Sequence, residues 1–360
     1  EPVSVPFHSR GQSPGYDEDP RLGGNLNQQQ YLGAPVSGQA FPWPEGGAMA
    51  PGTPLLGMPG GYQESMSVYG ANGPQPVRFG WAVNTDVGLL AKERTSAGAN
   101  GHFGIFEVNT EARYTTALPT QWIFSIAPQF NLRLWDGPTL NGGTTATSVT
   151  TVGLPAEVYR LGGDLRLTSP TWGPYSIELG FTPSLNTDFE QGASSDAWIF
   201  DGRGALIVRS SPQWMWVLGA TYWDRVEDRV LPYAGIVYTP NDRLEVRALF
   251  PRADINIFMG TPWGVPQWLY VAGEYHIEAY QIQLPSRTVT ATTDVTTFTR
   301  DRIELEDWRV LGGIRSEYNG MTSFLEAGWV FGRQVQFARS MSPSGFDISS
   351  GFIARFGLRF

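Results

Sequence analysis

The amino-acid sequence predicts an all-β protein: a transmembrane antiparallel up-and-down β-barrel preceded by a disordered N-terminal tail. The first observation is a series of segments, each about ten residues long, in which apolar and polar side chains alternate from residue 77 to the C-terminus. The second is composition, because charged residues make up only 16% of the chain, whereas soluble domains average roughly 25%. The third is that no apolar run approaches the ~18–20 residues that a membrane-spanning helix requires.

The first 76 residues show neither a helical nor a strand period. They hold 12 of the chain's 27 prolines and 14 of its 43 glycines. Because proline lacks a backbone donor and glycine loses much entropy on ordering, residues 1–76 are predicted to be a disordered leader. Scattered apolar residues in this leader leave two alternatives open, contact with the cell wall and docking inside the barrel lumen. The predicted barrel then occupies residues 77–360.

The first predicted strand, residues 77–90, shows the alternation that later segments repeat. Trp81 and Val83 alternate there with polar side chains such as Asn84 and Asp86. A period of two places the apolar side chains on one face of a strand and the polar ones on the other. If the apolar faces lie in lipid, no strand edge can stay open, so the strands must close into a ring.

Two predicted strands depart from the simple pattern. Pro128 lies inside an alternating segment and removes a ladder donor, so we expect a bulge there. Near residues 214–222 both faces are apolar, which leaves the phase of that strand open. A soluble β-sandwich would also alternate. Here, however, the polar face repeatedly carries charge and many segments have an aromatic residue near one end, as a membrane barrel requires.

The connections between segments give a strand count. Short turns are expected near residues 117–119, 169–171, 211–212, 240–242, 262–264 and 319–320. Longer connections are expected near residues 91–102, 136–156, 185–196, 224–230, 283–302 and 338–348. Membrane barrels place short turns on the periplasmic side and long loops outside. If residues 244–250 and 255–259 are separate strands joined through Pro251, the count is 14, which we favour; if they form one irregular excursion, it is 12.

Charged side chains on the polar phase are predicted to line the lumen. These residues are Arg78, Asp86, Glu107, Glu111, Arg113, Arg133, Arg160, Asp164, Arg166, Asp201, Arg203, Arg247, Glu274, His276, Glu278, Arg309, Arg315, Glu317 and Glu326. The two signs nearly cancel, so the set favours neither an anion pore nor a cation pore. Because buried charges must be paired or wet, either a water-filled lumen or a dense ion-pair network satisfies them.

The sequence predicts no enzyme, no catalytic residue, no metal site and no cofactor. The chain has no cysteine, which excludes disulfides and sites built on cysteine, and its net charge of -9 argues against nucleic-acid binding. His276 lies between Glu274 and Glu278 on one face of a strand, a pattern that fits an ion-pair network with arginines better than a cation site. Acidic residues near the predicted outer mouth would either attract cations or form a solvated loop face. They are Asp294, Asp301, Glu304, Glu306 and Asp307.

The last ten residues carry apolar side chains at every second position and end on Phe360. This pattern resembles the terminal insertion signal of bacterial outer-membrane barrels, which the barrel-assembly machinery reads. The residues assigned to the signal are Phe352, Phe356, Leu358 and Phe360. Their predicted strand pairs with the first strand, residues 77–90, and so closes the ring.

Four phrases, at residues 231–235, 249–253, 269–275 and 351–360, make residues 77–360 resemble a family of uncharacterised bacterial outer-membrane β-barrels. The resemblance implies a location in the bacterial outer membrane and contact with the lipid bilayer, and it implies no activity. The leading functional hypothesis is a porin-like passive channel for small polar solutes. The alternative is a non-conducting structural or surface-interaction barrel, with its lumen closed by ion pairs or by the N-terminal tail.

Overall fold

The structure is a computed structural model that describes residues 79–96, 99–145, 147–190, 192–318, 321–339 and 344–360. The chain divides into two units, Glu1–Gly33 and Ala34–Phe360, and all described residues belong to the second. The predicted leader, residues 1–76, lies outside the described residues, as does the predicted lumen residue Arg78.

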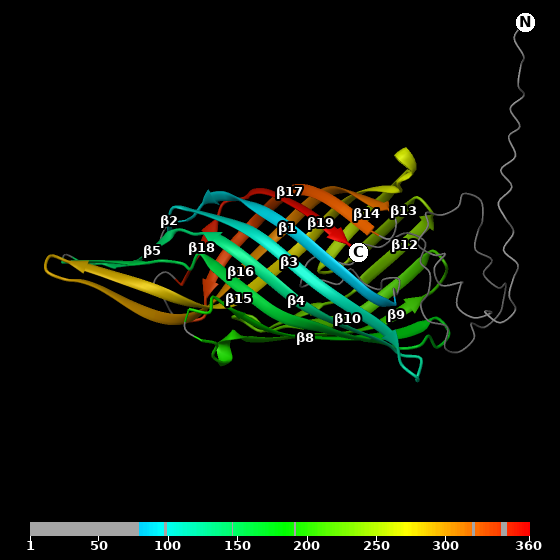
Figure 1. Ribbon diagram of the computed structural model, residues 1–360, viewed down its shortest axis with the longest axis horizontal. Coiled ribbons are helices and arrows are strands. Elements are labelled where there is room, and N and C mark those ends of the chain that lie inside the picture. The colour runs from blue at the N-terminus through cyan, green and yellow to red at the C-terminus, as the bar shows by residue number, and fades with distance from the viewer. Residues whose placement is uncertain (1–78, 97–98, 146, 191, 319–320, 340–343) are drawn as a thin grey trace, which may run out of the picture. The chain divides into compact units, whose positions relative to one another are not determined.

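Fourteen strands pair in sequence order and close into an antiparallel ring (Figure 1). They are β1 (Gly80–Arg94), β3 (His102–Ala117), β4 (Ile123–Asp136), β7 (Glu157–Thr168), β8 (Tyr175–Thr187), β9 (Trp198–Arg209), β10 (Trp214–Trp223), β11 (Arg229–Pro232) with β12 (Gly235–Asn241), β13 (Leu244–Leu249), β14 (Arg252–Gly260), β15 (Gln267–Thr290), β16 (Asp294–Tyr318), β17 (Met321–Phe337) and β19 (Gly351–Arg359). We count β11 and β12 as one interrupted strand because both pair with β10.

The last strand closes the ring on the first, as the sequence predicts. β19 runs antiparallel to β1, with Phe356 opposite Val87. Val83 and Phe360 exchange two backbone hydrogen bonds, of 3.2 and 2.9 Å, at the end of this pairing. The predicted transmembrane barrel of 14 strands is therefore confirmed, and its first and last strands meet at the end of the barrel that carries the short turns.

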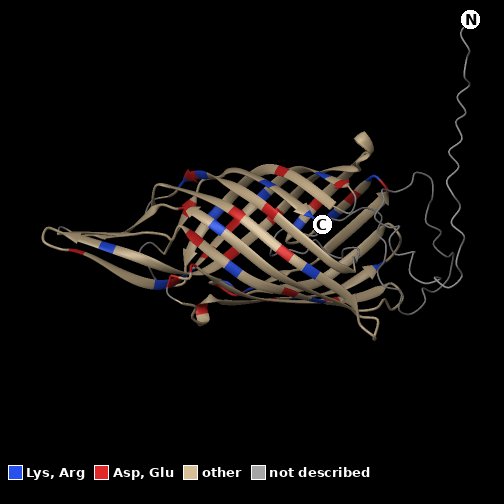
Figure 2. Cartoon of the chain, in the orientation of Figure 1, with Lys and Arg blue, Asp and Glu red and all other residues tan. Residues whose placement is uncertain are grey.

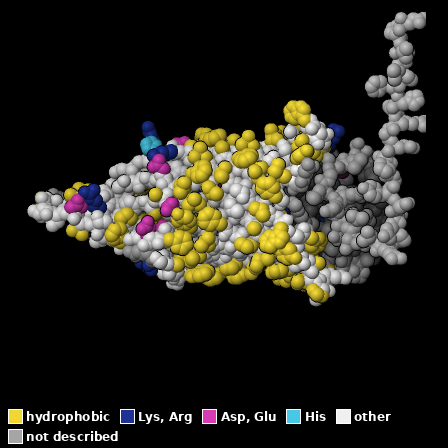
Figure 3. Space-filling view, viewed as in Figure 1, with side chains coloured by type: hydrophobic (Ala, Val, Ile, Leu, Met, Phe, Trp, Pro, Cys, Tyr) yellow, Lys and Arg dark blue, Asp and Glu magenta, His cyan; other side chains and the backbone are white. Residues whose placement is uncertain are grey.

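The outer wall is apolar, as the strand period predicts. Figure 3 shows hydrophobic side chains spread over the wall, while charged side chains gather toward the loop end at the left. The sequence leaves undecided which face of β10 points outward. In the structure Trp216 and Leu218 are exposed on the outer face, whereas Met215 and Val217 are buried. Among the described residues, no helix has the length and apolar character needed to cross a membrane.

The expected bulge at Pro128 is wrong. On both sides of the proline, β3 and β4 keep one register: Glu111 lies opposite Gln129, and Tyr114 lies opposite Ile126. The ladder to β7 is continuous through Pro128 itself. The proline therefore interrupts pairing only toward β3, which is the neighbour that its missing donor would serve.

The predicted connection at residues 283–302 is mostly strand. β15 continues to Thr290, and β16 begins at Asp294, so the two strands form a long hairpin beyond the barrel wall (far left in Figure 1). β6 (Ser148–Val152), which pairs with β5 (Thr139–Thr144), adds to the free edge of β15. Threonine and valine dominate the hairpin, and these β-branched residues favour extended structure over a loop.

The remaining elements lie in the connections. They are β2 (Ala99–Asn100), β18 (Gly345–Ile348), and the short 3-10 turns η3 (Ser195–Ala197) and η4 (Pro262–Gly264). β2 pairs with β5, and β18 pairs with the end of β17, so both extend the sheet at the loop end.

The barrel wall is short at the β13–β14 hairpin, and this short wall determines how the strands are arranged at the loop end. β13 has 6 residues and β14 has 9, whereas β15 has 24. The last β14–β15 pair is Arg252 with Glu274, so β15 continues without β14 beside it. The next strand outside the hairpin that pairs with β15 is β8, through Gln281 and Thr187. β8 lies six strand positions away from β15 in the ring. β15 therefore crosses the mouth of the barrel, and both of its faces are buried from Glu274 to Ile282.

We predict that Phe360 contributes to assembly in two ways, through its aromatic ring and through its backbone hydrogen bonds. Deleting Phe360 removes the two backbone hydrogen bonds to Val83, each worth about 1 kcal/mol, and the exposed aromatic ring on which the predicted insertion signal depends. We expect the folded, heat-modifiable fraction on detergent gels to fall several-fold, more than for Phe360→Ala, which keeps the backbone bonds. Normal assembly of the deletion variant would contradict the signal assignment, and Phe360→Tyr serves as the control that keeps an aromatic end.

Candidate functional site: the charged lumen

The predicted lumen residues that the structure describes lie on the inward phase of their strands, and on most strands the alternate apolar side chains are exposed. Those that are buried are Asp86, Glu107, Arg113, Arg133, Arg160, Asp164, Asp201, Arg247, Glu274, His276, Glu278, Arg309, Arg315 and Glu326. Those that are half-buried are Glu111, Arg166, Arg203 and Glu317. Figure 2 shows acidic and basic residues interspersed along the strands, without large regions of one sign. The lumen of the described barrel is therefore lined by mixed charges that have little contact with solvent.

One group of charges spans the lumen. Arg133 on β4 donates to Glu278 on β15 through Nε (3.1 Å) and Nη2 (2.6 Å). On the shorter way around the ring, β3, β1, β19, β17 and β16 lie between these two strands. This two-pronged ion pair therefore joins opposite walls. Asn186 on β8 makes a second link across, because its amide donates to the carbonyl of Ala279 on β15 (2.8 Å).

The cross-lumen pair belongs to a wider network. Glu107 lies 4.0 Å from Arg133 and 3.4 Å from Arg309, which also binds Asp307 at 2.7 Å. Arg309 donates to Nδ1 of His276 (2.9 Å), and Nε2 of the same ring lies 3.1 Å from Glu278. The network thus returns to Glu278, and its carboxylates and arginines close a loop across the lumen.

His276 and its two flanking glutamates do not converge on one point. Glu274 is bound by Arg252 (2.9 Å) and Arg355 (3.2 Å), whereas Glu278 is bound by Arg133. Among the described residues, no group of three or more histidine and carboxylate side chains is arranged to hold a metal ion. The pattern is thus part of an ion-pair network with arginines, which is the interpretation that the sequence favours.

A second group of charges fills the lumen between β14 and β19. Arg355 binds both Glu274 and Glu326, the latter at 2.6 Å, and Tyr270 donates its hydroxyl to Glu326 at 2.8 Å. Gly313 makes room for this tyrosine, because a Cβ atom at that position would lie 2.6 Å from the ring. A substitution at Gly313 would therefore displace the ring from the network.

A third group surrounds a single aspartate. Asp164 on β7 lies within 3.4 Å of guanidinium nitrogens from Arg113, Arg166 and Arg203. Arg203 also binds Glu178 at 3.3 Å. Three cations around one carboxylate leave no site for a further mobile cation there, and the long side chains occupy the space inside this part of the wall.

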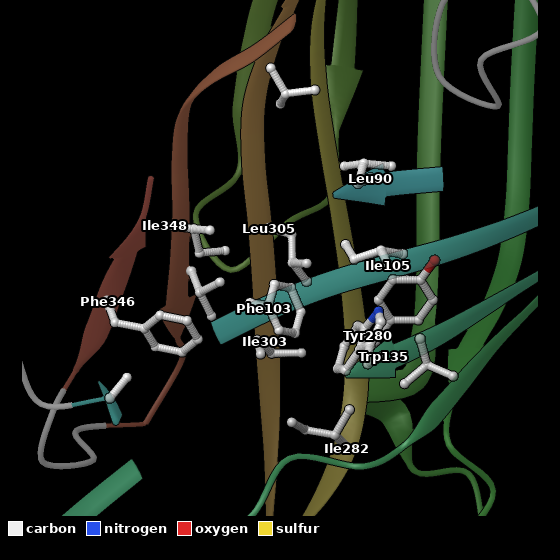
Figure 4. Packing of buried hydrophobic residues seen from close by; sticks show 14 of the residues in the cluster. Leu90, Phe103, Ile105, Trp135, Tyr280, Ile282, Ile303, Leu305, Phe346 and Ile348 are labelled. Carbon is white, nitrogen blue, oxygen red and sulfur yellow. The ribbon is translucent and has the colours of Figure 1, made fainter. Parts of the chain in front are cut away.

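At the loop end the inner surface is apolar, a feature that the alternating pattern of the strands does not predict. Phe103, Trp135, Tyr280 and Phe346 form edge-on ring contacts there, with centroid distances of 5.8 to 6.3 Å. Figure 4 shows these rings packed with isoleucine and leucine side chains from β15 and β16. Because Trp135 is on β4 and Tyr280 is on β15, this apolar cluster also joins opposite walls.

The acidic residues expected at the outer mouth are mostly buried and bound, so the prediction of a solvated or cation-attracting face is wrong for them. Glu304 and Glu306 lie 2.7 and 2.9 Å from Arg229. Asp307 binds Arg309, and Asp301 accepts backbone hydrogen bonds from Arg302 and Arg339. Only Asp294, which pairs with Arg287 at 2.6 Å near the tip of the hairpin, is exposed. The crossing of β15 and β16 over the mouth explains this burial.

Several charged residues of the lumen were not predicted from the sequence. Arg333 lies on the outward phase by simple alternation, yet it is buried inside. Gly332 has a left-handed φ of 60°, and the β16–β17 register shifts by one residue there, so this bulge reverses the phase. Arg225 comes from a predicted loop and binds Asp201 at 2.7 Å. Gly332 could have indicated the reversed phase at Arg333. No local sequence pattern, in contrast, indicates that Arg225 binds Asp201.

Arg133 is predicted to stabilise the barrel mainly by neutralising buried carboxylates. Arg133→Ala leaves Glu278 and Glu107 short of a cation, and removing one partner of a buried pair typically costs roughly 3–5 kcal/mol. The double variant Arg133→Met, Glu278→Met removes both charges of the pair. Its loss of stability should therefore be clearly smaller than that of Arg133→Ala. Urea titration of folding into lipid vesicles, followed by tryptophan fluorescence, measures both. A double variant less stable than the single one would contradict this assignment.

No family model matches the sequence, and no curated protein matches it either. Solved structures with a similar chain path include the toluene transporter TodX from Pseudomonas putida (8% identity, TM-score 0.29, 79% of this chain and 90% of that one). Others are an outer-membrane channel from Pseudomonas putida F1 (12%, 0.33, 79% and 97%) and the translocator domain of the autotransporter NalP from Neisseria meningitidis (8%, 0.28, 79% and 89%). Similarities at these TM-scores carry no inference about what this chain does.

Proposed function

We propose that this chain is a barrel of the bacterial outer membrane whose lumen is closed in its resting state. In this proposal it serves as a structural or surface-interaction barrel rather than as an open porin. The observation that carries the proposal is the ion pair between Arg133 and Glu278, which joins opposite walls at 2.6 Å with both side chains buried. Lipid around the wall and the barrel-assembly machinery at insertion are the proposed partners.

The energetics of buried charges support a closed lumen. A solute passing through the middle of the barrel would have to separate Arg133 from Glu278 and Arg309 from Glu107. Breaking a buried pair without replacing its partner costs several kcal/mol, and the network couples several such pairs. Thermal motion alone therefore opens the path rarely.

The apolar cluster supports the same proposal through a second barrier. It lies at the loop end, where the rings of Trp135 and Tyr280 meet across the lumen. A small polar solute that enters this region loses its hydration without gaining hydrogen bonds, which is unfavourable. Two barriers of opposite chemistry therefore lie in series along the barrel.

The hairpin beyond the barrel wall supports a role at the surface. β6, β15 and β16 form a sheet there with several exposed threonines, and its exposed apolar side chains are Val149, Val289, Val295 and Phe298. In β16, residues 294–299 are all exposed. This sheet offers side chains and backbone groups to partners outside the membrane.

A passive channel for small polar solutes is the second candidate. It is favoured by the mixed charges in the middle of the lumen, which would suit polar solutes if the crossing hairpin moved away. Conduction would then depend on a displacement of β15 from Thr187 of β8, and it would appear as rare openings rather than as a steady current.

Conductance in planar lipid bilayers distinguishes the two candidates. We expect the purified chain to show no steady conductance, because the ion pairs and the apolar cluster both close the lumen. The same result is expected without residues 1–76, since the closing groups all belong to residues 79–360. A steady open current from the full chain would overturn the closed-barrel proposal. A current that appears only after truncation would assign the closure to the leader.

A further inference from the structure

The side of the barrel at β13 and β14 is too short to match a bilayer. The outward apolar residues of β14 extend from Ala253 to Met259. At a rise of ~3.3 Å per residue and a tilt near 40°, they cover about 15 Å, compared with about 25 Å for the apolar band of an outer-membrane barrel. The bilayer must thin beside this hairpin, or the barrel must tilt there.

The turn that follows β14 holds an unusual tryptophan. Trp263, in η4, has a left-handed backbone conformation with φ 54°, and its side chain is 93% exposed, the largest fraction among the exposed apolar residues of the described chain. Two backbone hydrogen bonds, Gly264 to Thr261 (3.0 Å) and Val265 to Pro262 (3.1 Å), hold the turn. A bulky residue is strained in this conformation, and such strain persists where it serves a function. Here it aims a large ring away from the protein.

The turn continues the lipid-facing surface. Met259 and Leu269, on the strands before and after it, are exposed on the apolar wall. No charged residue occurs between Asp254 and Glu274. In Figure 1 the yellow turn η4 stands out sideways from the wall, near the end where the chain terminates, and Figure 3 shows an uncharged projection there.

Other aromatic side chains mark the membrane surface at the same end. Trp81, Trp172, Tyr318 and Phe360 are all exposed by half or more. They lie next to the short turns or to the closing pair of strands, as an interfacial belt requires. Trp263 therefore projects from the level of this belt and not from the middle of the wall.

We infer that the η4 turn is a lateral lipid anchor, in which Trp263 enters the boundary between headgroups and acyl chains beside the low wall. Tryptophan favours this boundary because its ring is apolar and its N–H remains hydrogen-bonded. The anchor fixes the depth of the barrel where the short β13 and β14 provide the least apolar height. This role is independent of whether the lumen conducts.

The absence of cysteine from the chain allows a direct test. An NBD dye is attached to the folded Trp263→Cys variant, and the protein is placed in phosphatidylcholine vesicles with or without doxyl-labelled lipid. Leu269→Cys, on the apolar wall, is the control for lipid contact. Asp242→Cys, on the exposed turn between β12 and β13 at the same end, is the control for water. Heat-modifiable migration verifies that each variant is folded.

We expect the dye at position 263 to emit farther to the blue than the Asp242→Cys control. We also expect doxyl groups near the headgroup to quench it more strongly than doxyl groups deep in the acyl chain. Emission and quenching equal to those of the Asp242→Cys control would overturn the inference. So would a blue shift without lipid quenching that disappears when the protein is diluted in the vesicles, because a second copy would then cover the turn. If Trp263→Cys does not fold, a dye on Thr261→Cys keeps the tryptophan and gives the same comparison.

Discussion

The requirement that a buried charge have a partner determines the interior of this barrel. Lipid outside the wall selects apolar side chains at every second position, and the period of a strand then turns the alternate, often charged, side chains inward. Because those side chains have little contact with water, each must be bound by the protein. Arginine suits this task, since its long side chain and five donors can reach and bridge carboxylates on distant strands. The pair between Arg133 and Glu278, which are 145 residues apart in sequence, is the most direct expression of this constraint.

The closure of the mouth follows from a local feature of the wall. The β13–β14 hairpin ends early, so β15 loses its neighbour after Glu274. A strand with an open edge seeks another partner, and β15 finds β6 and β8 on the opposite side. Its crossing brings Tyr280 against Trp135 and buries acidic residues that would otherwise face solvent. The same short hairpin leaves little apolar height outside, where η4 projects from the wall. One low segment of wall thus affects both the lumen and the contact with lipid.

Much of the fold was predictable from the sequence because it depends on local periodicity. Alternation gave the inward and outward phases, the turn residues gave fourteen strands, and the apolar final strand pointed to its pairing with the first. The phase failed at Arg333, where the Gly332 bulge inserts one residue. The sequence predicts a loop where the long β15–β16 hairpin lies, because the β16 arm exposes both of its faces near the tip and so lacks a clear period.

The arrangement of the lumen was less predictable than its composition. Alternation places Glu278 and Arg133 on inward faces, but only the closed ring brings them together across the lumen. The sequence therefore left a water-filled pore and an ion-pair network as equal solutions. The choice depends on how far each side chain reaches in three dimensions and on the crossing of β15, and neither leaves a short-range pattern.

The access of a small thiol reagent to the lumen tests the closed barrel most directly. Ala272 lies in the apolar cluster with 2% of its surface exposed, whereas Thr292 is exposed at the tip of the long hairpin. In the folded protein in vesicles, a methanethiosulfonate reagent should modify the thiol of Ala272→Cys far more slowly than that of Thr292→Cys. Unfolding in urea should make the two rates equal. Equal rates in the folded protein would show that water and small solutes reach the apolar cluster inside the barrel, and they would contradict the closure of the lumen by ion pairs and apolar packing.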